Sequence, residues 1–365
     1  MDAFNLDSLD WPKLVASLGG EEALAASALE RKAFVRARGV KSAPDLLRLA
    51  LLYGPGGHSL RTVSALAAAR GVADVSDVAI LGRMKASADW LQFLCEERLS
   101  AVGKDVVGEG LAARVRIVDG SRIAGPGDGA SRRTAWRLHL CYDPGAARIV
   151  EASVTTTKQG ERLDRLAVTV GEARLADRGF PQPDGINNTL EAKADALVRV
   201  TWNSVQLRDL RGEPLDWLKL YAESEARGGL DIDVRLHKER GKFEPVPMRL
   251  CLFKKTPEAA AKALAAAKRA SKKNKRRTDP RTLAGAGHIA LLTSLGRDAL
   301  TAQKIGALYR VRWQVELAFK RLKSILRMDR LPAKDPQLAR AWLYAHLLVA
   351  LLIEETLAPL GAASP

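Results

Sequence analysis

The stretch that decides the fold is YRVRWQVELAFKRLK, which runs from Tyr309 to Lys323. If it is helical, at about 100° per residue, its polar side chains Tyr309, Arg312, Glu316 and Lys323 share an arc of roughly 60°. The neighbouring arc is apolar, so burying that arc leaves the Glu316 carboxylate at the shoulder of the core among cationic and phenolic groups. A carboxylate held there can supply oxygen to a hard cation, while Arg, Lys and Tyr side chains bind neighbouring phosphates.

A plainer interpretation of the same stretch is a solvent-exposed helix. Arg312 and Glu316, and Glu316 and Lys320, are also i,i+4 pairs of the kind that stabilise surface helices by a few tenths of a kcal/mol. Taken alone, the stretch favours this interpretation. The rest of the chain has to decide between the two.

Composition indicates a basic globular protein with a polyanionic partner. The 365 residues suffice for two or three domains, or for one large core with insertions. A formal net charge of +16 and a pI of about 9.9 favour nucleic acid, with a membrane surface as the alternative. The longest apolar run, Leu343 to Ile353, is interrupted by His346 and is too short to span a bilayer.

The amino-terminal residues carry acids at Asp2, Asp7 and Asp10, where a secretory leader would be basic and then apolar. Cys95, Cys141 and Cys251 are far apart and form no C-x-x-C pair. We therefore expect reduced thiols, no zinc site, no membrane partner and a cytoplasmic location. Any catalytic metal must be held by carboxylates, which favours magnesium or manganese.

The first 110 residues or so are predicted to be helical. A helix from Ser59 to Arg70 is broken at Gly71, and Ser76 with Asp77 begins another that runs through Arg83 and Lys85. Two short helices around a glycine turn are typical of a helix-turn-helix, in which Arg83 and Lys85 would face DNA. A plain helical bundle fits the same pattern equally well.

The pattern changes to strands near Ala113. Arg114 to Asp119, Trp136 to Tyr142 and Arg148 to Thr156 are predicted as three strands joined by short turns. There follow a helix from Glu161 to Val170, a strand from Ala173 to Ala176, a helix around Glu191 and a strand from Leu197 to Trp202. This order is typical of a mixed sheet covered by helices.

Two acids stand where predicted strands end, Asp119 after the first strand and Asp177 after the fourth. The ends of neighbouring strands in such a sheet are a favoured place for ligands. The alternative is local: Asp119 forms a turn before Gly120, and Asp177 pairs with Arg178 or caps a helix. Both interpretations are open for either residue considered singly.

A basic segment follows two short predicted strands, Leu230 to Leu236 and Val246 to Phe253. Residues 254–281 hold eleven Lys or Arg against only Glu258 and Asp279, which is over half of the charge excess of the chain. The segment from Glu258 is predicted to be helical, and its basic end is predicted to bind nucleic acid. The residues of this end are Lys272, Lys273, Lys275, Arg276 and Arg277.

Three segments carry a resemblance to a known family: IVDGS at 117–121, ADRGF at 176–180, and the stretch from Tyr309 to Lys323. The last has the spacing Tyr, two residues, Arg, three residues, Glu, six residues, Lys. On these segments the chain, from about residue 113 to 350, resembles the DDE transposases of the insertion-sequence group called IS-four. The resemblance implies an α/β fold with a ribonuclease-H-like mixed sheet flanked by helices.

The same resemblance implies roles for individual residues. Asp119, Asp177 and Glu316 would be the catalytic triad that binds two Mg²⁺ ions, with Mn²⁺ as a substitute. Tyr309, Arg312 and Lys323 would contact double-stranded DNA, with Lys320 and Arg178 as neighbouring contacts. Handling two DNA ends together implies a homodimer in the DNA complex, associated with the bacterial nucleoid.

The predicted domains are a helical DNA-binding domain (1–110), the first part of the catalytic core (111–202), a strand-containing insertion with the basic arm (203–287), and the second part of the core with C-terminal helices (288–365). The predicted function is magnesium-dependent cleavage at the ends of a mobile element, followed by transfer of the 3′-hydroxyl into target DNA. The alternatives are a catalytically inactive, transposase-derived DNA-binding protein and a ribonuclease-H-like nuclease.

Overall fold

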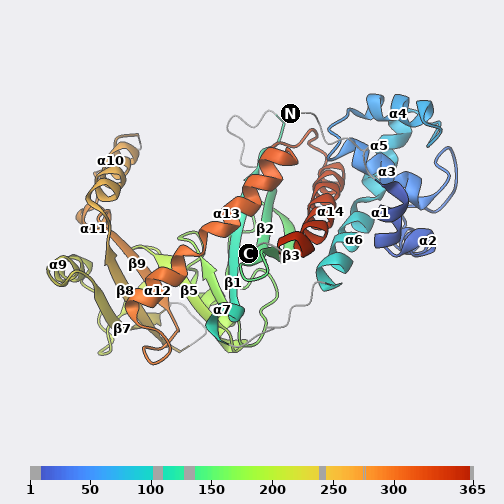
Figure 1. Ribbon diagram of the computed structural model, residues 1–365. Coiled ribbons are helices and arrows are strands. Elements are labelled where there is room, and N and C mark those ends of the chain that lie inside the picture. The colour runs from blue at the N-terminus through green and yellow to red at the C-terminus, as the bar shows by residue number, and fades with distance from the viewer. Residues whose placement is uncertain are drawn as a thin grey trace.

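A nine-stranded mixed sheet forms the centre of the protein (Figure 1). The computed structural model describes residues 10–101, 110–126, 136–237, 244–273, 275 and 277–361. The strand order is β3-β2-β1-β4-β5-β9-β8-β7-β6. The strands are β1 (Val115–Ile123), β2 (Trp136–Asp143), β3 (Arg148–Thr156), β4 (Ala173–Ala176), β5 (Asp195–Val200), β6 (Gln206–Arg208), β7 (Leu230–His237), β8 (Val246–Lys254) and β9 (His288–Thr293).

Strands β1 to β5 form the ribonuclease-H-like half of this sheet. β1, β2 and β3 are antiparallel, whereas β1, β4 and β5 are parallel, with Ile117 paired to Leu175. The predicted fold class is therefore confirmed. One boundary differs: β1 continues to Ile123, so Asp119 lies within the strand, paired with Leu140, and is not followed by a turn.

The predicted helix from Glu161 to Val170 is wrong. The backbone there is irregular, and Leu163 and Leu166 are buried beneath it at 0% and 3% exposure. Arg174 on β4 is completely buried and donates through Nη1 to the carbonyl oxygens of Leu163 (2.5 Å) and Leu166 (2.9 Å). A buried guanidinium thus provides the hydrogen bonds that a helix would otherwise have made within itself.

The insertion extends the same sheet. β9 pairs with β5 on one side and with β8 on the other, and β7 and β6 follow outward. Helices α9 (Trp217–Arg227), α10 (Pro257–Lys273) and α11 (Pro280–Gly285) belong to this part, and Figure 1 shows them gathered at its outer end. No side chain of α10 is buried among its described residues, which leaves its basic face open to a ligand.

The amino-terminal region is helical, as predicted, and lies beyond the β3 edge of the sheet (Figure 1). Its helices are α1 (Trp11–Ser17), α2 (Gly20–Glu30), α3 (Ala43–Tyr53), α4 (Leu60–Ala69), α5 (Asp77–Ala86) and α6 (Ala88–Ala101), and the short α7 (Leu111–Arg114) leads into β1. The two basic residues predicted to face DNA make contacts within the chain. Arg83 donates to the carbonyl of Arg36 (3.1 Å), and Lys85 pairs with Asp335 (2.7 Å).

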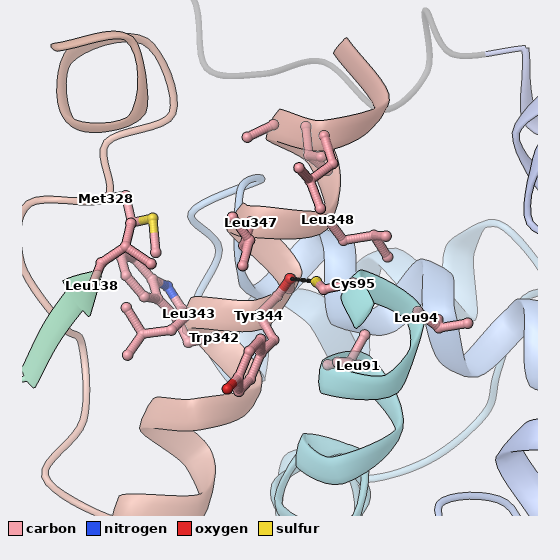
Figure 2. Close-up of a cluster of buried hydrophobic side chains, with 14 of the residues drawn as sticks. Leu91, Leu94, Cys95, Leu138, Met328, Trp342, Leu343, Tyr344, Leu347 and Leu348 are labelled. Atoms are coloured by element: carbon pink, nitrogen blue, oxygen red, sulfur yellow. Dashed lines mark hydrogen bonds between the residues drawn. The ribbon is translucent and has the colours of Figure 1, made fainter. Parts of the chain in front are cut away.

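The long helix α14 (Pro336–Gly361) packs against α6 and the sheet (Figure 2). Cys95 Sγ donates to the carbonyl of Tyr344 (3.4 Å), and the backbone N–H of Ile149 on β3 donates to Glu354 (2.9 Å). The part of α14 from Pro336 to Thr356 is long and apolar enough to cross a membrane, but 72% of its most apolar window is buried inside the protein. It is the central helix of a core shared by the two ends of the chain.

The stretch from Tyr309 to Lys323 is helical with one break. Tyr309 lies at the end of α12 (Ala302–Arg310), Arg312 caps α13 (Trp313–Lys320), and Lys323 lies in a π-helical turn, η2 (Arg321–Ile325). The apolar face is buried as predicted, with Val315 at 0%, Phe319 at 8% and Leu322 at 4% exposure. This burial leaves the polar residues at the margin of the core.

Candidate active site

Asp119 lies on β1 with most of its side chain buried. Its Oδ1 accepts from the backbone N–H of Gly120 (2.8 Å), and 15% of the side chain is exposed. Burial raises the pKa of Asp119 to about 6. The Gly120 hydrogen bond and Arg312 act in the opposite direction, whereas the charges of Asp177 and Glu161 raise this pKa further.

Asp177 follows β4, the parallel neighbour of β1. β1 and β4 run in parallel, and Ile117 is paired with Leu175. Asp119 and Asp177 each come two residues after this pair, so they lie level with each other. Asp177 Oδ1 accepts from the backbone N–H of Gly179 (2.6 Å). The first two predicted acids are therefore brought together by the register of the two strands.

Glu316 is joined to this pair through Arg312. Arg312 Nη1 lies 3.3 Å from Asp119 Oδ2, and Nη2 lies 2.6 Å from Glu316 Oε1. The Arg312 side chain is 17% exposed and that of Glu316 is 61% exposed, so the third acid faces solvent above a largely buried guanidinium. Arg312 also lies 5.9 Å from the centre of the Tyr309 ring, and burial raises the pKa of the Tyr309 hydroxyl.

The remaining predicted DNA contacts divide into two groups. Lys323 Nζ donates to the carbonyl of Arg122 on β1 (3.2 Å), and burial lowers the pKa of Lys323. Arg178 and Lys320 are exposed, the first beside Asp177 and the second at the end of α13.

The basic arm lies elsewhere. Lys272 and Lys273 end α10, Lys275 has a left-handed backbone (φ 50°), and Arg277 precedes α11. Arg276 lies outside the described residues. Figure 1 shows α10 at the outer end of the insertion, away from α13 and β1, so the arm and the acids are separate parts of the molecule.

The donor set fits a hard divalent cation. Carboxylate oxygens are the ligands that Mg²⁺ and Mn²⁺ prefer, and a cation would stabilise the charged form of Asp119, whose pKa is raised chiefly by burial and further by neighbouring acids. Within the described part of the chain, no three His, Cys, Asp or Glu side chains converge closely enough to hold an ion as they stand. Arg312 occupies the space between Asp119 and Glu316, so its guanidinium must turn away before these two carboxylates share one.

The sequence pattern missed a fourth acid, Glu161, at this site. A Cβ built on Gly120 would lie 3.0 Å from Glu161 Oε1, and one built on Gly179 would collide with Glu161 Oε2. Burial raises the pKa of Glu161, Arg137 lowers it, and the charge of Asp177 raises it further. The available signal was a glycine close behind each aspartate, which leaves room for another side chain.

Two cations beside the site were also missed. Arg199 on β5 lowers the pKa of the Tyr309 hydroxyl, and both Arg199 and Arg178 oppose a positive charge on Lys255, whose pKa is lowered chiefly by burial. Lys255 Nζ donates to the carbonyl of Ala286 (2.7 Å). These residues extend the positive charge from the acids towards the insertion.

Comparison with known proteins places the sequence among enzymes of one class. A family model described as "Transposase DDE domain" matches residues 110–352. The chain is 40% identical over 356 residues to the putative transposase InsL of insertion sequence element IS186A from Escherichia coli strain K12, covering 96% of this chain and 94% of that protein. It is also 40% identical over 357 residues to the transposase of insertion sequence element IS421 from Escherichia coli, with the same coverages.

A solved structure also aligns with the chain. It is the piggyBac transposase synaptic complex with hairpin DNA, with a TM-score of 0.37 and 11% identity over 69% of this chain and 49% of that one.

Proposed function

Because the chain belongs to the DDE transposases of the IS-four group, we propose that Asp119, Asp177 and Glu316 are its catalytic triad. The protein is a DNA transposase, an enzyme that cleaves DNA and transfers strands with the help of a divalent metal. The finer proposals concern which residues do this, which metal serves, and how the protein assembles on DNA.

One observation carries the residue assignment: Arg312 contacts Asp119 and Glu316 at once. Asp177 directly follows β4, the parallel neighbour of β1, level with Asp119. A single arginine therefore connects acids that are 193 and 4 residues away from it in the sequence. A solvent-exposed helix stabilised only by i,i+4 pairs would have no reason to place Arg312 against Asp119 of β1.

The three carboxylates would hold two Mg²⁺ ions, or Mn²⁺ in their place. When bound, the ions activate the attacking oxygen and stabilise the leaving oxygen in an in-line displacement at phosphorus. Arg312, freed from the acids, is in position to donate to a phosphate of the DNA end. Lys323, which is hydrogen-bonded to the Arg122 carbonyl on β1, would bind a neighbouring phosphate. Tyr309 lies beside Arg312 and would contact the DNA end there.

One site of this kind serves two reactions. Water first attacks the phosphodiester at the element's end and frees a 3′-hydroxyl, which then attacks a phosphodiester of the target. Two ends must be processed together, so we propose a homodimer in the DNA complex. Its DNA substrate places the protein at the bacterial nucleoid, in the cytoplasm.

The triad is tested with Glu316→Gln, which keeps the shape of the side chain and removes its charge. We expect magnesium-dependent strand cleavage to be abolished and binding to terminal DNA to be retained. Glu97→Gln makes the same change at an exposed residue of α6, away from the acids, and as the control it is expected to retain cleavage. Cleavage by Glu316→Gln at the normal rate would refute the assignment of the third acid.

A plasmid assay separates this function from the two alternatives. Purified protein is incubated with magnesium and a supercoiled plasmid that carries the element's ends. Joined product supports the transposase, nicks alone indicate a nuclease, and binding without product indicates an inactive DNA-binding protein.

A further inference from the structure

The irregular segment between β3 and β4 is held rigidly although it is not helical. Arg174 fixes its backbone at Leu163 and Leu166 from within the core. At its outer side, Asp164 accepts two hydrogen bonds from Arg162 (2.8 and 2.6 Å) and one from Asn188 on α8 (Pro183–Glu191) at 2.7 Å. The residue at the start of this segment, Glu161, is therefore placed by the fold.

The Glu161 carboxylate lies beside Gly120 of β1, which follows Asp119, and beside Gly179 in the loop that carries Asp177. Its Cγ and Oε1 are each 3.0 Å from the position that a Cβ would take on Gly120. Its Oε2 blocks the Cβ position of Gly179, which is also 3.0 Å from Asp177 Oδ1. Oxygens of Glu161 and Asp177 thus share the space over Gly179.

An arginine faces this carboxylate. Burial raises the pKa of Glu161 most, and Arg137 lowers it more than Asp177 raises it. Arg137 Nε lies 3.5 Å from Glu161 Oε1, and that nitrogen has no hydrogen-bond partner among the described residues. The long ion pair offsets only part of the free-energy cost of placing a third carboxylate beside two others. A divalent cation shared by the three would offset that cost.

We propose that Glu161 is a fourth carboxylate of the metal site and ligates a divalent cation together with Asp119 and Asp177. This inference rests on the assignment of the triad above. Asp119, Asp177 and Glu161 are all carried by the sheet and its anchored segment, whereas Glu316 is exposed on α13 and paired with Arg312. Asp119, Asp177 and Glu161 do not converge closely enough to hold an ion as they stand. The first ion would therefore draw these carboxylates together without DNA, and Glu316 would join when Arg312 turns to the substrate.

The test is a calorimetric titration of the DNA-free protein with Mn²⁺. Removing one charged ligand is expected to weaken binding by about tenfold or more. Glu161→Gln and the shorter Glu161→Asp should both show this loss, while Glu316→Gln should bind Mn²⁺ much as the unchanged protein does. Glu97→Gln alters an exposed carboxylate on α6 that has no part in placing Glu161, and it should bind Mn²⁺ normally.

Asp177→Asn separates failure of this inference from failure of the triad. If Asp177→Asn loses Mn²⁺ binding and both Glu161 variants retain it, Glu161 is not a ligand and the triad stands. If Asp177→Asn itself binds Mn²⁺ normally, the triad assignment fails. Binding to DNA in the presence of a chelator checks that each variant is folded.

Discussion

Arg312 Nη1 lies 3.3 Å from Asp119 Oδ2, across 193 residues of sequence, and ties β1 to the helix that carries Glu316. The same guanidinium holds Glu316 at 2.6 Å. Arg312 therefore lies between two acids, Asp119 and Glu316, where a divalent cation would otherwise bind. This relationship leads to the first of five predictions.

Replacing Arg312 by Lys keeps the charge but removes the planar group that reaches both acids. We expect strand cleavage to fall by roughly ten- to a hundredfold, because a hydrogen bond to a charged group contributes about 1.5–3 kcal/mol. Arg310→Lys, at the end of α12, is the control, since the hydrogen bond that Arg310 donates goes to the carbonyl of Gly306 in its own helix (3.4 Å). Equal cleavage rates for both variants would contradict the role proposed for Arg312 at the DNA end.

Gly179→Ala should disrupt the site through its added methyl group. The Cβ would collide with Glu161 and lie 3.0 Å from Asp177, so one carboxylate must shift. We expect weaker Mn²⁺ binding and slower cleavage, since misplacement by about 1 Å can cost a hundredfold in rate. Gly160→Ala is the matched control, because nothing lies within 4 Å of its Cβ position.

Arg174→Met should destabilise the whole protein. It leaves the buried Glu172 carboxylate, 2% exposed, without its partner and removes the donors to the Leu163 and Leu166 carbonyls. Breaking a buried pair in this way costs about 3–5 kcal/mol in the free energy of unfolding, measurable by denaturant titration. Adding Glu172→Gln should recover part of the loss.

The control for that experiment is Arg162→Met. Arg162 is also paired with a carboxylate, but its side chain is 36% exposed, so the expected loss is small. A similar loss in the free energy of unfolding for both variants would show that the burial of Arg174 does not explain the effect of replacing it.

Stability should fall as the pH is lowered below about 6.5. Burial lowers the pKa of His346 and of His139 from 6.5 to about 4, and Arg165 and Arg137 lower that of His139 further. Between these pH values the unfolded chain binds more protons than the folded one, so stability is complete above about pH 6.5 and is lost towards pH 4. The expected slope reaches about 1.4 kcal/mol per pH unit for each histidine.

Denaturant unfolding at several pH values measures this slope. His346→Gln removes one of the two titrating groups and should flatten it, whatever its effect on stability near neutral pH. An unchanged slope would mean that His346 is not held neutral beside the Trp342 carbonyl, which accepts from its Nδ1 at 2.8 Å.

Neutralising the basic arm should change the salt dependence of DNA binding. The slope of log K against log salt falls by about 0.9 for each DNA phosphate that the protein no longer neutralises. Replacing Lys272, Lys273, Lys275 and Arg277 by Gln should therefore weaken binding and flatten the slope. Replacing the exposed Lys219 and Arg227 on α9 is the control, and equal slopes for both sets would remove the arm from the DNA-binding surface.

Local patterns in the sequence predicted most strands of the sheet, whereas the roles of Asp119, Asp177 and Glu316 come from the family resemblance and stay a prediction. Alternation in β2, the short runs of β1 and β4, and the spacing of Arg312 and Glu316 each determine a local structure that the tertiary fold keeps. Helix α13 preserves the predicted contact between Arg312 and Glu316 in spite of the break before it.

The segment from Glu161 to Val170 could not be predicted in the same way. Its leucines are spaced as in a helix, but their burial and backbone hydrogen bonds are set by Arg174, a residue of another element. Tertiary contacts therefore override the local preference. Glu161 was missed as a site residue for the same reason, since its position depends on that anchored backbone.

The packing of α6 against α14 also bears on how the protein is made. Cys95 and the Tyr344 carbonyl, 249 residues apart, meet in the interior, so a chain still emerging from the ribosome cannot bury its amino-terminal helices until translation is nearly finished. A product shortened at its C-terminus would lose more than its last helix, because the apolar surface of α6 would remain open to aggregation or proteolysis.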